Sequence, residues 1–493
     1  MSTSTLTNPE LPTFGVEVEF LIAAVPPGIF KDPHRHIKGL PPVLRLPDFT
    51  SNYANFETRE YFTIRRVKEV LDEHFGTPSP LSLLPKYQTW RVTNDSSISE
   101  MGGSPYILIP IEINSPVYYA SPDGFDAVKT AIALITSKFR CTVNSSCGVH
   151  VHVGMGLERL SLDQVRRMAS LCYAVEPLLF TLHHPVRRVN KYCKPLREHS
   201  YLSQVEEGHM LPHHKNNSRF KFREGSECYQ YIGRDRRHGE YPISRREETL
   251  DPALMNGFLT TRKPGHFEPF ISPDDSTHAE TFLDNISHQL DLRISATEPS
   301  TTAPGERPRK RNIPRLRTPP LTPEEIAELQ DMLPVGEGYE NSPPAAADPG
   351  TSVFEATQRI YSQPASCYIS KQMHSGSLFE RLAINFQAYS CDNLVFSKRT
   401  MRTIEFRFGE GSLDGDWIST WAKICAGILS FALYSSPRDF INVLTNCDKA
   451  SREEGVYDII DLLDDIGLFA EAEKAEQRLM ANKDEWQLKF VSS

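Results

Sequence analysis

The stretch from Phe14 to Phe20, Phe-Gly-Val-Glu-Val-Glu-Phe, places two carboxylates two residues apart inside a short apolar run. Because side chains alternate between the two faces of a β-strand, Glu17 and Glu19 share one face while the valines and Phe20 point to the other. Two neighbouring acids repel each other unless a cation lies between them. The stretch therefore predicts a strand whose polar face is either an ordinary solvated surface or the floor of a metal site.

Two more predicted strands repeat this design, with an apolar face and an ionisable face in strict alternation. One carries His150 and His152, another carries Glu405 and Arg407, and a weaker fourth strand carries Glu112. A merely solvated face would carry mostly Lys, Thr, Ser and Gln. Glutamates with imidazoles instead suit Mg²⁺ or Mn²⁺ that works with substrate phosphates, and a nearby arginine suits phosphate oxygens.

Each of these residues also has a plainer interpretation when it is taken alone. A single histidine is more often a structural residue bonded to a neighbour than a metal ligand. Arg407 and Glu405 could form an ordinary surface ion pair. The recurrence of the pattern on several strands favours the metal site over these separate explanations.

The familiar phosphate-binding loops are absent from the sequence. Gly409-Glu-Gly411 and Gly154-Met-Gly156 begin like glycine-rich motifs, but Asp414 and Arg159 stand where the third glycine is needed. No Gly-x-x-x-x-Gly-Lys segment occurs. Any nucleotide would therefore have to be held by metals and side chains.

Composition narrows the class of protein. The 493 residues allow a large core, and the net charge of -9 argues against a general nucleic-acid or membrane-surface binder. We expect no signal peptide and a cytoplasmic location, because the polar N-terminus lacks a basic-then-apolar arrangement. The longest apolar run, Ile424 to Tyr434, is shorter than the roughly 20 residues of a membrane helix. Nine cysteines without a Cys-x-x-Cys pair favour reduced, mostly buried thiols over a disulfide framework.

Strands separated by helices and loops of uneven length, without an internal repeat, favour an α+β fold. Two capping boxes, Ser161-Leu-Asp-Gln164 and Thr322-Pro-Glu-Glu325, each predict the start of a helix. We expect a disordered N-terminus at 1–13, a catalytic domain whose two parts are 14–205 and 367–435, an insertion at 206–366, and a helical segment at 436–493.

The expected insertion is first basic, from Leu211 to Glu248, and then rich in proline. Ten of the fifty residues from 301 to 350 are proline, which argues against a regular core and predicts disorder around 296–350. A basic cluster lies in this part of the chain, and it is interpreted as a nuclear-import signal, a contact for an acidic protein partner, or a solvated linker. Its members are Arg307, Arg309, Lys310, Arg311, Arg315 and Arg317.

Four segments taken together resemble the amidoligase family of ATP-dependent carboxylate-amine ligases, which shares its catalytic fold with glutamine synthetase and glutamate-cysteine ligase. The resemblance implies a curved, mostly antiparallel sheet of about six strands with helices packed on one face. The segments are Gly15-Val-Glu-Val-Glu-Phe20, Ile111-Glu-Ile-Asn-Ser-Pro116, Ser146-Cys-Gly-Val-His-Val-His-Val153 and Thr403-Ile-Glu-Phe-Arg407.

The resemblance also implies roles for individual residues. One Mg²⁺ or Mn²⁺ would be held by Glu17, Glu405 and one histidine, either His150 or His152; the family's preference points to His150, although both face the site. A second metal would be held by Glu19, Glu112 and Asp95. Arg407 would bind the γ-phosphate of ATP, and Arg188 of the basic segment 187–192 would touch nucleotide or substrate.

The implied reaction joins a small-molecule or peptide carboxylate to an amine through an acyl phosphate. Glu17, Glu19 and Arg407 would be its catalytic residues. Two other functions remain open on the sequence. His150, His152 and a glutamate could hold Zn²⁺ in a hydrolase. Alternatively, the chain could be a non-catalytic, nucleotide-binding scaffold whose proline-rich segment binds protein partners.

Overall fold

A computed structural model of the chain describes residues 11–28, 32–48, 58–76, 78–79, 87–95, 97–99, 102–204, 311–334, 351–375, 381–390 and 402–491. Residues 1–10 of the expected disordered N-terminus and the basic stretch from Leu211 to Glu248 lie outside the described residues.

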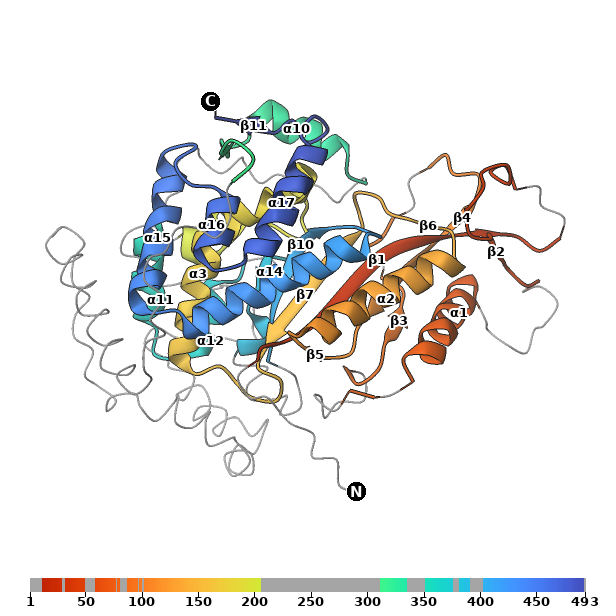
Figure 1. Ribbon diagram of the computed structural model, residues 1–493, viewed down its shortest axis with the longest axis horizontal. Helices are drawn as coiled ribbons and strands as arrows, with labels where there is room; N and C mark the ends of the chain where they lie inside the picture. The colour runs from red at the N-terminus through yellow and green to blue at the C-terminus, as the bar shows by residue number, and fades with distance from the viewer. Residues whose placement is uncertain are drawn as a thin grey trace, which may run out of the picture.

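A mostly antiparallel, open sheet organises the fold (Figure 1). Its main path runs in the order β3, β4, β1, β7, β10, β9, and all neighbours on this path are antiparallel. Three two-residue strands add to β1, so the sheet has nine strands rather than the six expected. Such short strands carry no periodic pattern that a sequence could reveal. The strands are β1 Thr13–Val25, β2 Leu44–Arg45, β3 Arg91–Thr93, β4 Ile107–Asn114, β5 Tyr118–Tyr119, β6 Cys141–Thr142, β7 Gly148–Gly154, β9 Ile384–Asn385 and β10 Ile404–Glu410.

Proline at position 110 is tolerated in β4 because the strand lies at the edge of the sheet at that point. β3 pairs only with residues 112–114 of β4, while the pairing of β4 with β1 continues through Pro110, which lies opposite Leu21. Among the described residues no strand pairs with Pro110 on that side, and an edge position of this kind is where a sheet tolerates proline.

Helices cover one face of the sheet, where Val16, Val18 and Phe20 join the main hydrophobic core. Helices α2 and α14 lie across β1 and β7 (Figure 1). Trp421 of α14 packs on Phe406 and Phe408 of β10, with ring centroids 6.2 and 5.2 Å apart. The helices of this part are α1 Arg59–His74, α2 Pro122–Lys138, α3 Leu162–Phe180, α4 Leu196–His199, α5 Tyr201–Gln204, α14 Gly415–Tyr434 and the short 3₁₀ helices η2 Pro185–Val189 and η3 Gln387–Tyr389.

The capping box predicted at Ser161 is confirmed at the start of α3. α14 is the one helix among the described residues whose length and composition would allow a membrane crossing, and 67% of its apolar window is buried inside the protein. That degree of burial is typical of a core helix. Among the described cysteines, six are free thiols, five of them buried, and Cys367 forms a disulfide.

Residues 311–334 form an ordered strap, although we expected disorder there. β8 Leu316–Arg317 pairs with β11 Lys489–Phe490, and α10 Pro323–Asp331 starts at the predicted capping box of Thr322. The strap is held by tertiary contacts that composition does not reveal: Arg311 and Arg315 pair with the fully buried Asp458 and Asp461. The rest of the expected disordered segment, 296–310 and 335–350, lies outside the described residues.

The described chain continues at residue 351, inside the segment that we expected to be an insertion. α11 Val353–Tyr361 packs against α3, and α12 Ser366–Gln372 follows. The chain then ends in helices α15 Pro437–Arg452, α16 Ile459–Asp465 and α17 Phe469–Ala481 before β11.

Candidate functional site

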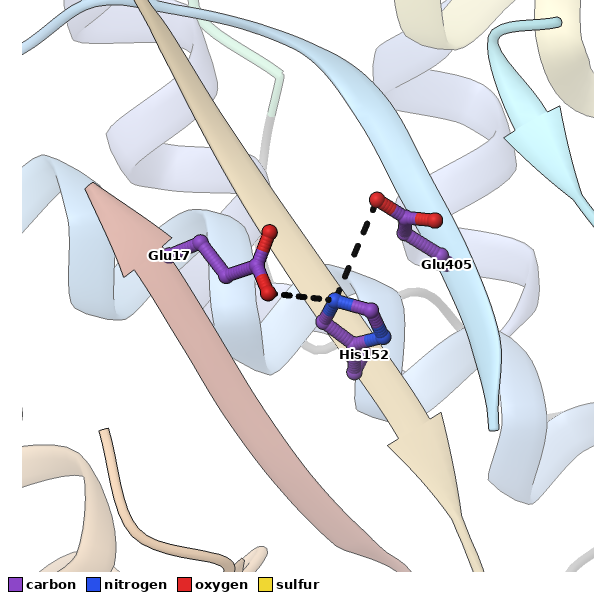
Figure 2. A group of neighbouring side chains, drawn as sticks. All are labelled: Glu17, His152 and Glu405. Atoms are coloured by element: carbon purple, nitrogen blue, oxygen red, sulfur yellow. Dashed lines mark ion pairs between the residues drawn. The ribbon is translucent and has the colours of Figure 1, made fainter. Parts of the chain in front are cut away.

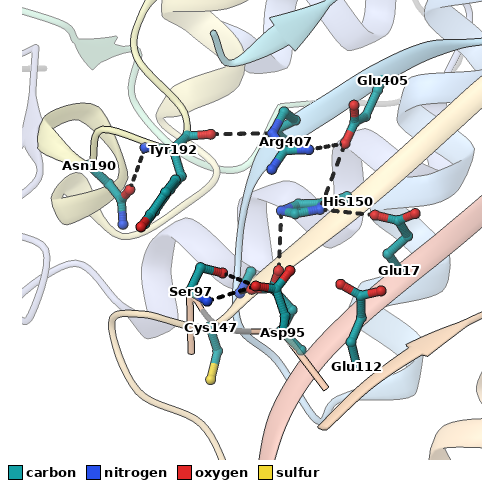
Figure 3. Close-up of polar contacts among 12 residues, drawn as sticks. Glu17, Asp95, Ser97, Glu112, Cys147, His150, Asn190, Tyr192, Glu405 and Arg407 are labelled. Atoms are coloured by element: carbon teal, nitrogen blue, oxygen red, sulfur yellow. Dashed lines mark hydrogen bonds and ion pairs between the residues drawn. The ribbon is translucent and has the colours of Figure 1, made fainter. Parts of the chain in front are cut away.

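The polar faces of four strands meet on the side of the sheet opposite the main core. In the register of the strands, Glu17 lies opposite His150, and Glu405 lies opposite His152. Glu19 lies opposite Glu112 on the other side of β1. The strands thus bring together the acids and imidazoles that the alternating pattern singled out (Figure 3).

Glu17, His152 and Glu405 form one set of potential ligands, here called the Glu17 group, whose ligand atoms all lie within 4.8 Å of one another. His152 Nε2 is 3.2 Å from Glu17 Oε1 and 3.8 Å from Glu405 Oε1 (Figure 2). The three side chains come from β1, β7 and β10, so the sheet itself fixes their spacing.

Glu19, Asp95 and Glu112 form a second set with the same spacing, here called the Glu19 group. The backbone N–H of Gly148 donates to Glu19 Oε2 at 2.6 Å. Asp95 Oδ1 accepts from the backbone N–H and the hydroxyl of Ser97, at 2.7 and 2.8 Å. Hydrogen-bond donors thus orient Glu19 and Asp95. Glu112 is oriented in the same way by Thr93 and Asn114.

His150 lies between the two groups and is almost completely buried. Its Nδ1 is 3.3 Å from Glu17 Oε2, and its Nε2 is 3.7 Å from Glu19 Oε1. Both histidines face the site, as we expected. The structure places His152 in the Glu17 group and His150 at the boundary with the Glu19 group.

Arg407 borders the site next to the Glu17 group. Its Nη1 forms an ion pair with Glu405 Oε1, and its Nε donates to the backbone carbonyl of Tyr192 at 3.3 Å (Figure 3). Of the two arginines in the basic segment 187–192, Arg187 contacts these strands, through the carbonyls of Cys147 and Arg407. Arg188, which we had selected, instead has its Nη2 3.9 Å from Glu198 Oε1.

The Glu17 group combines two carboxylates whose pKa values are lowered with an imidazole whose pKa is raised. Burial alone would raise the pKa of Glu17, but the neighbouring His152 and His150 hold it well below its ordinary value. Burial would also raise the pKa of Glu405. The charges of Arg407 and His152 outweigh burial, so this pKa is lowered as well. Burial would lower the pKa of His152, but the charges of Glu17 and Glu405 raise it to about 9.

In the Glu19 group, nearby positive charges do not outweigh the effect of burial on the carboxyl pKa values, unlike in the Glu17 group. Burial raises the pKa of Glu19, although His150 and Arg187 act in the opposite direction. Burial and the charge of Glu17 raise the pKa of Glu112 to about 7. A cation in this group would favour the ionised forms of Glu19 and Glu112 and so oppose the effect of burial on their pKa values.

Sequence reasoning missed the residues that orient the ligand atoms. Asn114 Nδ2 and Thr93 Oγ1 donate to Glu112 Oε1 at 2.6 and 3.3 Å. Asn385 Nδ2 donates to Glu405 Oε2 at 2.9 Å, and Thr403 Oγ1 lies 3.2 Å from His152 Nδ1. Two of these were within reach of the period-two rule, because Asn114 and Thr403 each lie two residues from a selected acid and so share its face. Thr93 and Asn385 depend on strand pairing, which the sequence does not reveal.

The donor set fits hard divalent cations. Five carboxylates and two imidazoles converge from the described strands and the loop that carries Asp95. Oxygen-rich sets of this kind suit Mg²⁺ and Mn²⁺. Outer donors hold the carboxylates, as is usual around metal ligands.

Comparison with known proteins bears on this arrangement. A family model described as "Putative amidoligase enzyme" matches residues 11–239. No curated protein and no solved structure matches the chain. The matched span contains Glu17, Glu19, Asp95, Glu112 and both histidines, whereas Glu405 and Arg407 of β10 lie beyond it. The match confirms the resemblance seen in the sequence, and it places residues 11–239 in similarity to the amidoligase family.

Proposed function

We propose that the protein is an ATP-dependent ligase that joins a carboxylate to an amine through an acyl phosphate, with Mg²⁺ or Mn²⁺ as its metal. The observation that carries this proposal is the pair of acidic groups that share β1, with the guanidinium of Arg407 beside them. The match of residues 11–239 to the amidoligase family model supports a ligase in general terms. The ATP dependence and the metals are our additions.

The two groups would hold the metals, with Glu17, His152 and Glu405 in one site and Glu19, Asp95 and Glu112 in the other. Metals held by these residues would supply positive charge that neutralises the charge developing during phosphoryl transfer. Arg407 adds a fixed positive charge on the β10 side, where it would bind the transferred phosphoryl group.

The reaction has two steps. An oxygen of the substrate carboxylate attacks the γ-phosphorus of ATP, and the bond to the β-phosphate oxygen breaks, which releases ADP and leaves an acyl phosphate. The amine nitrogen then attacks the acyl carbon, the bond from carbon to phosphate oxygen breaks, and phosphate leaves. The proton lost by the amine passes to a base or to water. The chain's part is to hold the phosphates and to shield the acyl phosphate from water.

The direct test is an acyl-phosphate trap. The protein is incubated with MgATP, hydroxylamine and a panel of small-molecule and peptide carboxylates, and hydroxamate and ADP are measured. We expect both products in equal amounts with a subset of the carboxylates, and neither product with a Glu17→Gln variant. If no carboxylate in the panel gives ADP above the rate without enzyme, the ligase proposal is wrong.

A zinc hydrolase is the second candidate, because His150 and His152 both lie within 3.3 Å of a Glu17 oxygen. Two imidazoles and a carboxylate are a familiar set of zinc ligands. The same experiment separates the two functions. Hydrolysis that needs Zn²⁺ and no ATP would favour the hydrolase, whereas MgATP binding without turnover would favour a scaffold.

A further inference from the structure

Arg187 is a buried arginine that the proposed reaction does not use. It belongs to η2 and only 3% of its surface is exposed. Its Nη2 donates to the backbone carbonyl of Arg407 at 2.9 Å, and its Nη1 donates to the backbone carbonyl of Cys147 at 3.4 Å. One guanidinium thus connects the beginning of β7 with the middle of β10.

The contact with Arg407 lies at a β-bulge. Phe406 pairs with Val151 of β7, and the next pair joins Gly409 with Val149, so β10 has one residue more than β7 between these points. A bulge interrupts the ladder and redirects nearby side chains. On the other side of β10, the N–H of Arg407 donates to the carbonyl of Ala383 at 2.7 Å. The bulged residue is therefore held from both sides, by Ala383 and by Arg187.

The contact with Cys147 acts on the Glu19 group. The carbonyl of Cys147 and the N–H of Gly148 belong to the same peptide group. Arg187 binds this group at its carbonyl end, and Glu19 accepts from its N–H end at 2.6 Å. Because a positive charge at the carbonyl polarises the N–H, Arg187 both orients and strengthens the donor that holds Glu19.

Gly148 is required for this close approach. A Cβ atom at this position would lie 3.1 Å from Arg187 Nη2, 3.1 Å from His150 Nε2 and 3.3 Å from Glu19 Oε2. The absent side chain lets a guanidinium, an imidazole and a carboxylate meet over one peptide group.

The strap 311–334 holds η2 in place. Val186 and Val189, on either side of Arg187, form a small buried cluster with Leu333. The hydroxyl of Ser145, two residues before Cys147, donates to the backbone carbonyl of Met332 at 2.7 Å. The strap therefore contacts both of the segments that Arg187 connects.

We infer that Arg187 is a positioning residue: it holds the β10 bulge and the Cys147–Gly148 peptide group so that Arg407 and Glu19 keep their places in the site. The consequence for metal and phosphate binding rests on the proposed function. The structural link between the two strands does not depend on it.

The first experiment measures hydrogen–deuterium exchange in the full-length protein, for an Arg187→Gln variant and an Arg187→Lys variant. We expect faster exchange in the peptides that cover 147–154 and 404–411 in Arg187→Gln, and a smaller effect in Arg187→Lys, which keeps the charge but loses the forked geometry. Arg167→Gln is the matched control, since Arg167 is a buried arginine that also donates to main-chain carbonyls, at Ala432 and Ser435. Unchanged exchange in both segments of Arg187→Gln would overturn the inference.

The second experiment measures Mn²⁺ binding by titration calorimetry without nucleotide, followed by the kinetics of ADP formation. We expect Arg187→Gln to weaken Mn²⁺ binding about 10-fold to 100-fold, as is typical for residues that orient metal ligands, and to lower kcat more than it raises KM for ATP. Arg187→Lys should recover part of the loss, and Arg167→Gln should bind Mn²⁺ like the unaltered protein.

A direct contact with nucleotide is the alternative role, because Arg187 Nε has no hydrogen-bond partner among the described residues. If Arg187→Gln kept its Mn²⁺ affinity and lost only ATP affinity, Arg187 would be a nucleotide ligand and the inference would be wrong. If the unaltered protein bound no Mn²⁺ and formed no ADP, the proposed function would fail, and the exchange experiment would still decide the role of Arg187.

Discussion

Glu17 and Glu19 stand side by side on one face of β1, yet each belongs to a different group of potential ligands. His150 marks the boundary, since its two ring nitrogens face Glu17 and Glu19 at 3.3 and 3.7 Å. One strand can therefore serve as the common wall of two cation sites. The repulsion between adjacent acids is relieved because each acid turns toward its own partners.

If each acidic group holds one metal, as we propose, separate substitutions should abolish the two sites one at a time. We expect the unaltered protein to bind two Mn²⁺ ions, and Glu17→Gln and Glu19→Gln to bind one each, because an amide oxygen is a far weaker ligand than a carboxylate. Titration calorimetry measures the stoichiometry. Glu69→Gln, on the exposed side of α1, should still bind two. A single ion in the unaltered protein would contradict the two-site arrangement.

Arg407→Lys should lower kcat for ADP formation by about 100-fold while the protein stays folded, because lysine keeps the charge but loses the fork that reaches both Glu405 and the phosphate. Steady-state kinetics with MgATP measure the effect. Arg167→Lys makes the same exchange at a buried arginine away from the site and should keep nearly full activity. Full activity of Arg407→Lys would contradict the proposed role of the Arg407 guanidinium in phosphoryl transfer.

The strap is anchored by a buried charge, so Asp458→Asn should be strongly destabilising. Asp458 accepts from Arg311 Nη1 at 2.8 Å and from the backbone N–H of Leu316 at 2.6 Å. Removing its charge breaks the buried ion pair with Arg311 and leaves this guanidinium only the longer contact with Asp461 at 3.3 Å, which costs about 3 kcal/mol of the free energy of unfolding. Urea unfolding measures the loss. Arg317→Ala breaks an exposed pair with Glu454 and should cost about 1 kcal/mol or less.

His199 should make the protein sensitive to acid. Burial, together with the charge of Lys194, lowers the pKa of His199 to about 4. The unfolded chain takes up this proton near the ordinary histidine pKa of about 6.5, whereas the folded protein does not until about pH 4. The stabilising contribution is therefore complete above pH 6.5 and is lost as the pH falls toward 4, by about 3 kcal/mol.

Comparing a His199 variant with the unaltered protein separates the contribution of His199 to acid sensitivity from that of other titrating groups. His199→Gln should lose less stability than the unaltered protein between pH 7 and pH 4, as measured by urea unfolding at each pH. His74→Gln, an exposed change at the end of α1, should follow the unaltered protein. Parallel curves for His199→Gln and the unaltered protein would mean that the folded protein protonates His199 as readily as the unfolded chain does.

The acids and imidazoles of the site could be predicted because each lies on a strand whose period of two is visible in the sequence. Glu17, His152 and Glu405 were selected in this way, and the sheet brings them together. Arg187 could not be singled out from Arg188 in the same manner. It lies in a short 3₁₀ helix, where no repeating pattern tells which side chain points inward.

The order of the strap, residues 311–334, could not be predicted from the sequence. Its many prolines and arginines are typical of disordered chain, and its order depends on Asp458 and Asp461, which lie far along the sequence and are fully buried. The capping box of α10 was visible because it is a local signal. Contacts between distant segments are decided by tertiary structure, which composition does not encode.

The position of β10 has a consequence for the order in which the site is completed during synthesis. β10 is the last strand of the large sheet to leave the ribosome, and it inserts between β7 and β9. The Glu19 group is already encoded in the first third of the chain, whereas the Glu17 group lacks Glu405 until this strand arrives. A nascent or truncated chain that ends before β10 therefore carries one complete set of acids but not the second set or Arg407. Under the proposed function, such fragments would not consume ATP, so the reaction would be confined to molecules in which β10 has completed the sheet.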